Sequence, residues 1–282
     1  MCIAVIILNY SKRFPLLVAH NREEDIYRET SPLEQRGDVL AAYDIKAGGI
    51  AAVGLNIRTG TFAVLTNCRI KGSYLSSGES RGKFILEILE EWIPRVEGRV
   101  FQGYFHCLKG NAFGNEPKRI EYFTNLNCNL YPGEDLVDNR ELKIIVVMNQ
   151  HPLCENDWTS KLLYVKNALS GRLQASSSIE SGSELCDLVV SELSRTGFVL
   201  PSLNSECMWS PDPEAEKILQ RCIMVPPTLV RGGNDYVFGT ISQTVFVSDT
   251  VERSVLYRYR ETVDLATRST KFGHWSDRII SF

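Results

Sequence analysis

The sequence has no excess of positive charge. Its 31 Lys and Arg stand against 34 Asp and Glu, and the formal net charge at pH 7 is −3. A short basic pair such as Lys12-Arg13 is too small to act as a nucleic-acid-binding arm. We therefore expect no nucleic-acid partner.

Long apolar runs are missing as well. The apolar stretch at residues 2–8 is seven residues long, whereas a membrane-spanning helix needs about 20. A secretory signal peptide would carry a basic stretch before its apolar one, and none is present here. We expect a soluble cytoplasmic protein without a transmembrane segment.

Metal-binding and haem-attachment motifs are absent. The chain has eight cysteines, but no CxxC pair, no four-ligand zinc spacing and no CxxCH motif. We expect most cysteines to be small buried side chains in a reducing compartment, with no metal site and no required cofactor.

What is present is a β-rich start and end with helices between them. Strand patterns cover 2–8, 16–19, 50–55, 61–65, 144–148, 237–247 and 254–259, and the 144–148 strand is expected to be fully buried. Helical spacing begins after Ser80 and is expected to run to Pro94, and it covers 160–170 and 183–196. Ser183 is the expected N-cap and Gly197 the expected stop of the last of these, and Asp212-Pro213 opens another helix. The pattern predicts one α+β domain over residues 1–282, a sheet sandwich faced by helices.

Cysteine at position 2 is chemically informative. We expect Met1 to be removed, because cysteine is small enough to permit it, and Cys2 then carries a free α-amine. Such an amine has a pKa of about 7.7–8.0, so it can accept the thiol proton without a histidine base. The following strand would hold Cys2 rigidly and leave it partly accessible.

An ordered series of motifs follows Cys2. They are Asn21-Arg22-Glu23-Glu24, Asp44-x-x-x-Gly48-Gly49, Gly54-Leu55-Asn56, Leu65-Thr66-Asn67-x-Arg69, Ser80-Arg81-Gly82, Glu121–Asn125 and Phe238-Gly239-Thr240. This series resembles the NRDE family of transport and Golgi organisation 2 proteins, over nearly the whole chain. The resemblance implies the four-layer αββα sandwich of N-terminal-nucleophile (Ntn) hydrolases.

The resemblance also implies a site. In cysteine Ntn hydrolases, Glu23 would match the acid that holds the α-amine, and Asn67 the amide that donates to the oxyanion. Cys2, Glu23 and Asn67 are therefore the candidate catalytic residues, expected to meet in one cleft. The candidate ligand-binding residues are Cys2, His20, Asn21, Arg22, Arg69, Arg81 and Asn149. The arginines either pair a substrate carboxylate or bridge the acids at 23–25.

Four departures from the family pattern affect function. Ala-Ala before the first motif is Ala19-His20, NRDE is NREE, the tryptophan of GGTWLG is missing, and Ile241 replaces the arginine of YGTR. These changes preserve the scaffold and alter the residues around the site. They favour a binding role over an exacting hydrolase.

Three functions of different kinds remain open. The first, implied by the resemblance, is a carrier of haem or a similar amphipathic metabolite, with Cys2, His20 and Cys68 as iron ligands chemically suitable for exchangeable haem. The second is an amidase or thioesterase that uses Cys2. The third is a membrane-traffic scaffold with a vestigial pocket. The family's roles also imply peripheral contact with mitochondria, endoplasmic reticulum or Golgi.

Overall fold

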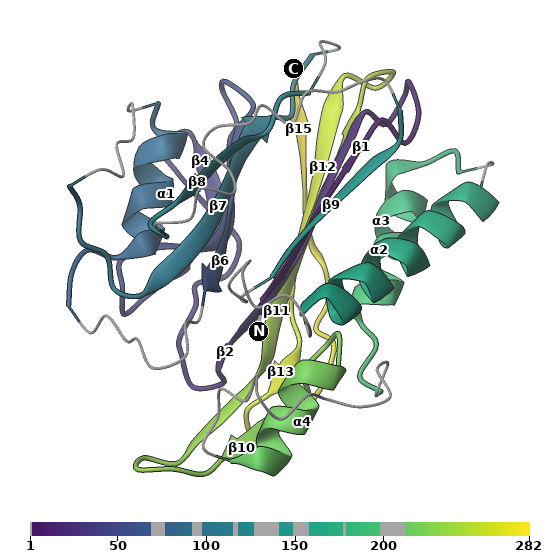
Figure 1. Cartoon of the computed structure of the whole chain (residues 1–282). Coiled ribbons are helices and arrows are strands. Elements are labelled where there is room, and N and C mark those ends of the chain that lie inside the picture. The colour runs from purple at the N-terminus through teal and green to yellow at the C-terminus, as the bar shows by residue number, and fades with distance from the viewer. Residues whose placement is uncertain are drawn as a thin grey trace.

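Two antiparallel β-sheets form the centre of the computed structural model, which describes residues 2–68, 77–91, 98–114, 118–126, 141–148, 158–176, 179–197 and 212–282 (Figure 1). The first sheet has the strand order β15-β12-β11-β2-β1-β9, with β10 beside β11. Its strands are β1 (Ile3–Leu8), β2 (Leu16–Asp25), β9 (Lys143–Met148), β10 (Thr228–Val230), β11 (Tyr236–Asp249), β12 (Ser254–Glu261) and β15 (Ser276–Ser281).

The second sheet is a meander in which each strand pairs with the next along the chain, in the order β3 to β8. Its strands are β3 (Glu34–Arg36), β4 (Val39–Asp44), β5 (Gly49–Asn56), β6 (Thr61–Cys68), β7 (Tyr104–Asn111) and β8 (Glu121–Thr124). A short hairpin, β13 (Val263–Asp264) with β14 (Ser269–Thr270), follows β12.

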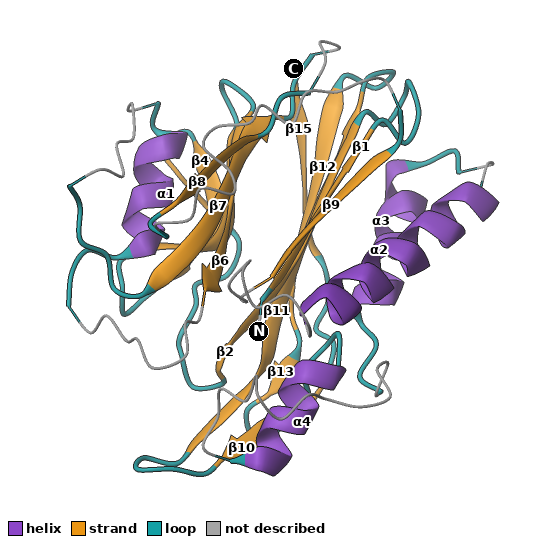
Figure 2. Cartoon of the chain, in the orientation of Figure 1, coloured by secondary structure: helices purple, strands orange, loops and turns teal. Residues whose placement is uncertain are grey.

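Helices cover the outer face of each sheet (Figure 2). α1 (Arg81–Leu89) packs on the second sheet, and α2 (Trp158–Ala175) and α3 (Gly182–Leu193) pack on the first. α4 (Pro213–Arg221) packs beside β10. The fold is α+β, as the sequence predicts, and none of the helices in the described ranges has the length and hydropathy needed to cross a bilayer.

β1 shows how the sequence dictates these layers. Its even-numbered residues, beginning with Ala4 and Ile6, pack between the two sheets, and its odd-numbered residues, beginning with Ile3 and Val5, pack against α2 and α3. A strand that is buried on both faces must be apolar throughout, which explains the uninterrupted apolar run.

Several element boundaries differ from the sequence prediction. β2 continues to Asp25, because β11 pairs with it along this whole stretch, so the Asn21–Glu24 motif lies inside the strand and not beyond it. β9 is an outermost strand of its sheet, and its residues alternate between buried and half-buried where full burial was predicted.

The helix ends differ as well. α1 ends at Leu89, short of the predicted Pro94, which lies outside the described residues. The N-cap of α3 is Ser181 and not Ser183, and α3 stops at Leu193 with Ser194 as C-cap, before Gly197. The predicted Asp212-Pro213 start of α4 is confirmed.

Candidate functional site

A small polar cleft lies where the N-terminal end of β1 approaches the second sheet and the start of α1. Its volume is about 60 Å³. Five of the residues predicted to form a site line it, namely Cys2, Arg22, Glu23, Asn67 and Arg81. These positions span 80 residues of sequence, and the two sheets and α1 bring them together. We refer to this feature as the Cys2 cleft.

Cys2 lies immediately before β1 and contacts the backbone of Glu23. The Glu23 N–H donates to Cys2 Sγ at 3.3 Å, and the thiol lies 3.5 Å from the Glu23 carbonyl oxygen. Antiparallel pairing of β1 with β2 places these groups side by side, because Ile3 is opposite Asn21. Cys2 is only 5% exposed, less than the partial access predicted from sequence.

Glu23 is 1% exposed, and Thr240 of β11 contacts its carboxylate. The Thr240 hydroxyl lies 3.4 Å from Glu23 Oε1 and accepts the Val225 N–H at 2.9 Å. Because Val225 can only donate, the hydroxyl proton is left for Glu23. Sequence reasoning did not assign Thr240 to the site, although it matched the Phe238-Gly239-Thr240 motif to the family.

Two arginines share one carboxylate at the cleft. Asp44 at the end of β4 accepts from Arg22 Nη2 at 2.9 Å and from Arg28 Nε at 3.1 and 2.9 Å. Arg22 therefore pairs with Asp44, and not with the acids at 23–25 proposed from sequence. Burial alone would lower the pKa of Arg28, but hydrogen bonding to Asp44 and its negative charge outweigh burial and raise it.

Arg81 enters the cleft because α1 begins unusually close to β5. A Cβ on Gly82 would lie 2.5 Å from the Ile50 carbonyl oxygen, and one on Gly49 would lie 2.4 Å from the Gly82 carbonyl carbon. Only glycine at both positions permits this approach of backbone to backbone. Arg81, the first residue of α1, donates to the Tyr104 carbonyl oxygen at 3.3 Å.

His20 does not line the cleft. It is 1% exposed, and its Nε2 donates to the Leu65 carbonyl oxygen at 3.0 Å. Burial lowers the pKa of His20 to about 3, and the positive charge of Arg22 adds to this effect, although the bond to Leu65 opposes it. His20 is therefore a neutral core residue at physiological pH.

Asn21 also lies away from the cleft. Its Nδ2 donates to the Leu193 carbonyl oxygen at 2.7 Å, and its Oδ1 accepts from Gln243 Nε2 at 2.9 Å. These bonds join β2 to the C-terminal end of α3 and to β11, which is a structural role. Arg69 and Asn149 lie outside the described residues.

A second cavity of about 490 Å³ lies beside the Cys2 cleft, and Arg28 lines both. Apolar side chains contribute to this second cavity, among them Ile26, Ile241, Val263 and Leu265. Sequence reasoning noted Ile241 only as a departure from the family pattern and did not predict this cavity. In the part of the chain that the structure describes, no set of three His, Cys, Asp or Glu residues is placed to hold a metal ion.

Comparison with known proteins adds one finding to this geometry. The model of a family described as transport and Golgi organisation 2 matches residues 1–260, which include every residue of the Cys2 cleft. No curated protein matches the sequence.

Proposed function

The chain belongs to the transport and Golgi organisation 2 family, and from this premise we propose that it binds and carries an amphipathic metabolite at the Cys2 cleft. The candidate ligands are haem and acyl compounds, each with an acidic end and an apolar body. The proposed location is the cytoplasm, with peripheral contact at mitochondria, endoplasmic reticulum or Golgi.

The position of Arg28 carries the proposal. Arg28 lines both the polar Cys2 cleft and the larger, partly apolar second cavity. Its Nε bonds Asp44, while its Nη nitrogens make no hydrogen bond within the described ranges. A ligand with an acid group at Arg28 and its apolar body in the second cavity would satisfy both environments.

The donors of Arg28, and not a net positive charge, favour an acid group at this point. Asp44 accepts from both Arg22 and Arg28, and Glu24 and Asp25 add negative charge near Arg28. The whole cleft is balanced, with three arginines against Glu23, Glu24 and Asp44. Arg28 is thus the position where a carboxylate gains charge-assisted hydrogen bonds.

Haem fits this arrangement only in one way. A porphyrin is far too large for the Cys2 cleft and would have to occupy the second cavity. His20 is buried in the core and lines neither the Cys2 cleft nor the second cavity, so we propose that haem is held through its carboxylates and not through His20.

The layer order supports an Ntn-hydrolase-like scaffold for this role. Separate apolar cores lie between α1 and the second sheet, between the two sheets, and between the first sheet and α2 and α3. We propose that this is the αββα order of an Ntn hydrolase, with Cys2 immediately before β1, which lies between β2 and β9.

Titration of the purified protein with haemin and with dodecanoate tests the proposal. We expect saturable binding, weakened about tenfold in Arg28→Gln, because charge-assisted hydrogen bonds contribute ~1.5–3 kcal/mol. Arg58→Gln is the matched control, since Arg58 is exposed in the turn between β5 and β6 and pairs with Asp38. Equal affinity in the parent and Arg28→Gln would reject the proposal.

A second candidate function is hydrolysis of the same class of ligand. Cys2, Glu23 and Asn67 line one cleft, as a cysteine amidase or thioesterase would require. The Cys2 thiol would give its proton to its own α-amine and attack the acyl carbonyl, the leaving amine or thiol would depart protonated, and water would release the acid. Asn67 would donate to the oxyanion.

Two measurements separate hydrolysis from carriage. Intact mass shows whether Met1, which lies outside the described residues, is absent from the purified protein and the α-amine therefore available. Time-dependent thioester hydrolysis that disappears in Cys2→Ala would establish the enzyme. If the protein showed neither ligand binding nor turnover, the membrane-traffic scaffold would be the remaining function.

A further inference from the structure

We infer that the second cavity is a subsite for an unbranched hydrocarbon chain, and that Ile241 determines which chains it accepts. This inference rests on the proposed function, since it places the apolar body of the ligand whose acid end binds Arg28.

A β-bulge places Ile241 in the cavity. Thr240 is opposite Glu23 and Ser242 is opposite Arg22, so Ile241 is an extra residue in β11. A bulge bends its strand and redirects the inserted side chain. Here Thr240 contacts Glu23 of the Cys2 cleft, whereas its neighbour Ile241 lines the second cavity. The β-bulge in β11 therefore contributes one residue to the Cys2 cleft contacts and the next residue to the second cavity.

The apolar side of the cavity is continuous from its interior to its rim. Ile26, Val237 and Ile241 form a buried cluster against which Val263 packs. At the opening, Tyr27, Ile45 and Leu265 are 50%, 51% and 53% exposed. The volume of about 490 Å³ lies within the range of ~300–1,000 Å³ that small-molecule sites occupy.

The charged side chains of the cavity orient the ligand. Arg36 pairs with Glu34 at 2.7 Å, and the remaining carboxylates, Glu29 and Glu261, are exposed. Acid groups at the rim disfavour the acid end of a ligand there, although solvent screening weakens the effect. The acid end is therefore expected at Arg28 and the chain along Ile241.

Calorimetric titration with octanoate, dodecanoate and hexadecanoate tests the subsite. In the parent we expect affinity to rise by up to about fourfold per added methylene until the cavity is filled. Ile241→Phe fills part of the cavity, so it should remove most of the gain in affinity from octanoate to dodecanoate.

A second variant tests the subsite in case Ile241→Phe does not fold. Leu265→Gln changes an exposed cavity residue and should weaken dodecanoate more than octanoate, while Ile279→Gln, exposed on β15, should change neither. The subsite alone would be overturned if ligands bound through Arg28 with an affinity that did not depend on chain length. It would also be overturned if neither cavity variant changed the affinity for dodecanoate. Absence of fatty-acid binding would overturn the subsite together with its acyl ligand, and the haemin titration would then decide the carrier role separately.

Discussion

Glu23 is positioned by groups from three parts of the chain. Its backbone contacts Cys2 Sγ, and its carboxylate accepts from Thr240, whose hydroxyl is in turn bonded to the Val225 N–H. Thr240 is 217 positions away from Glu23, and β11–β2 pairing brings it within hydrogen-bonding distance. The Thr240 hydroxyl thus orients the Glu23 carboxylate at the Cys2 cleft.

Replacement of Thr240 by valine tests this role. Valine keeps the shape and removes the donor, so we expect iodoacetamide to alkylate Cys2 about fivefold more slowly, since the lost hydrogen bond contributes ~1 kcal/mol. Peptide mapping assigns the modified cysteine. Thr240→Ser restores the donor and should restore the rate. Equal rates in the valine and serine variants would show that the hydroxyl has no such effect.

His20 makes stability depend on pH. Its pKa is about 3 in the folded protein and about 6.5 when unfolded, so between these values the unfolded chain binds a proton that the folded chain does not. Stability therefore falls as pH decreases from 6.5 towards 3. From pH 7 to pH 5 we expect this histidine to account for a loss of about 2 kcal/mol.

Urea unfolding at the two pH values measures this loss. His20→Gln keeps a donor for the Leu65 carbonyl and cannot titrate, so its stability should change less between pH 7 and pH 5 than that of the parent. His274→Gln, at an exposed position, should behave like the parent. A parent and a His20→Gln variant with the same pH dependence would contradict the burial effect.

Residue types and order in the sequence pointed to the polar cleft, but not to everything that surrounds it. Cys2, Glu23 and Asn67 were predicted to lie together, and all three line the Cys2 cleft. Their catalytic roles stay predictions. Asn21 and His20 were predicted beside the ligand, yet they face the core, because β2 continues through them and alternates between two buried faces.

At the scale of elements, the start of α3 shows where local pattern was ambiguous. Ser181 and Ser183 both precede the apolar face, and only Ser181 forms a capping box, with Glu184. The Ser181 hydroxyl accepts the Glu184 N–H at 3.2 Å. Ser183 instead accepts from Arg258 Nη1 at 3.2 Å. The position of Glu184, three residues after Ser181, was the signal that selects the true cap.

Alanine substitution of the two serines separates the alternatives. Ser181→Ala should lower the free energy of unfolding by about 1 kcal/mol, because an N–H at the helix start loses its acceptor. Ser183→Ala loses only the contact with Arg258 and should cost less. Urea denaturation measures both. A larger loss in Ser183→Ala would reassign the cap.

Irregular elements that depend on long-range strand pairing could not be predicted from local sequence patterns. β5, β6 and the Asp212 cap follow local patterns, and sequence alone located them. The bulge at Ile241 depends on the pairing of β11 with β2, which are more than 200 positions apart, so no local pattern marks it. The second cavity depends on this bulge and was missed for the same reason.

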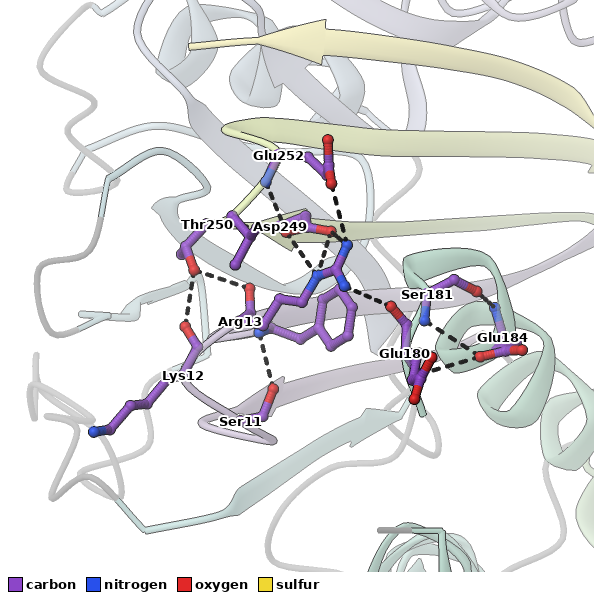
Figure 3. A network of polar contacts seen from close by, with 11 residues as sticks. Ser11, Lys12, Arg13, Glu180, Ser181, Glu184, Asp249, Thr250 and Glu252 are labelled. Carbon is purple, nitrogen blue, oxygen red and sulfur yellow. Dashed lines mark hydrogen bonds and ion pairs between the residues drawn. The ribbon is translucent and has the colours of Figure 1, made fainter. Parts of the chain in front are cut away.

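At the scale of the whole molecule, the two ends of β1 have different tasks. Cys2 and the cleft lie at one end, and at the other a polar network joins the β1–β2 turn to the β11–β12 turn and to the approach to α3 (Figure 3). Arg13 is its centre. Its guanidinium bonds Asp249 at 2.8–3.1 Å and the Glu180 carbonyl oxygen at 2.7 Å.

This separation predicts that stability and ligand binding can be altered independently. Arg13→Gln should lower the melting temperature, because it leaves the largely buried Asp249 carboxylate without its guanidinium partner. Lys12→Gln is the matched control, since the Lys12 amine points away from the network in Figure 3. Dodecanoate affinity should be unchanged in both variants, because Arg13 and Lys12 lie at the end of β1 opposite the Cys2 cleft. Differential scanning calorimetry measures the melting temperature, and the same ligand titration measures the dodecanoate affinity. If Arg13→Gln weakened dodecanoate binding at a temperature where it is fully folded, the two ends of β1 would be coupled through the sheet, and the cleft could not be treated as a site independent of this network.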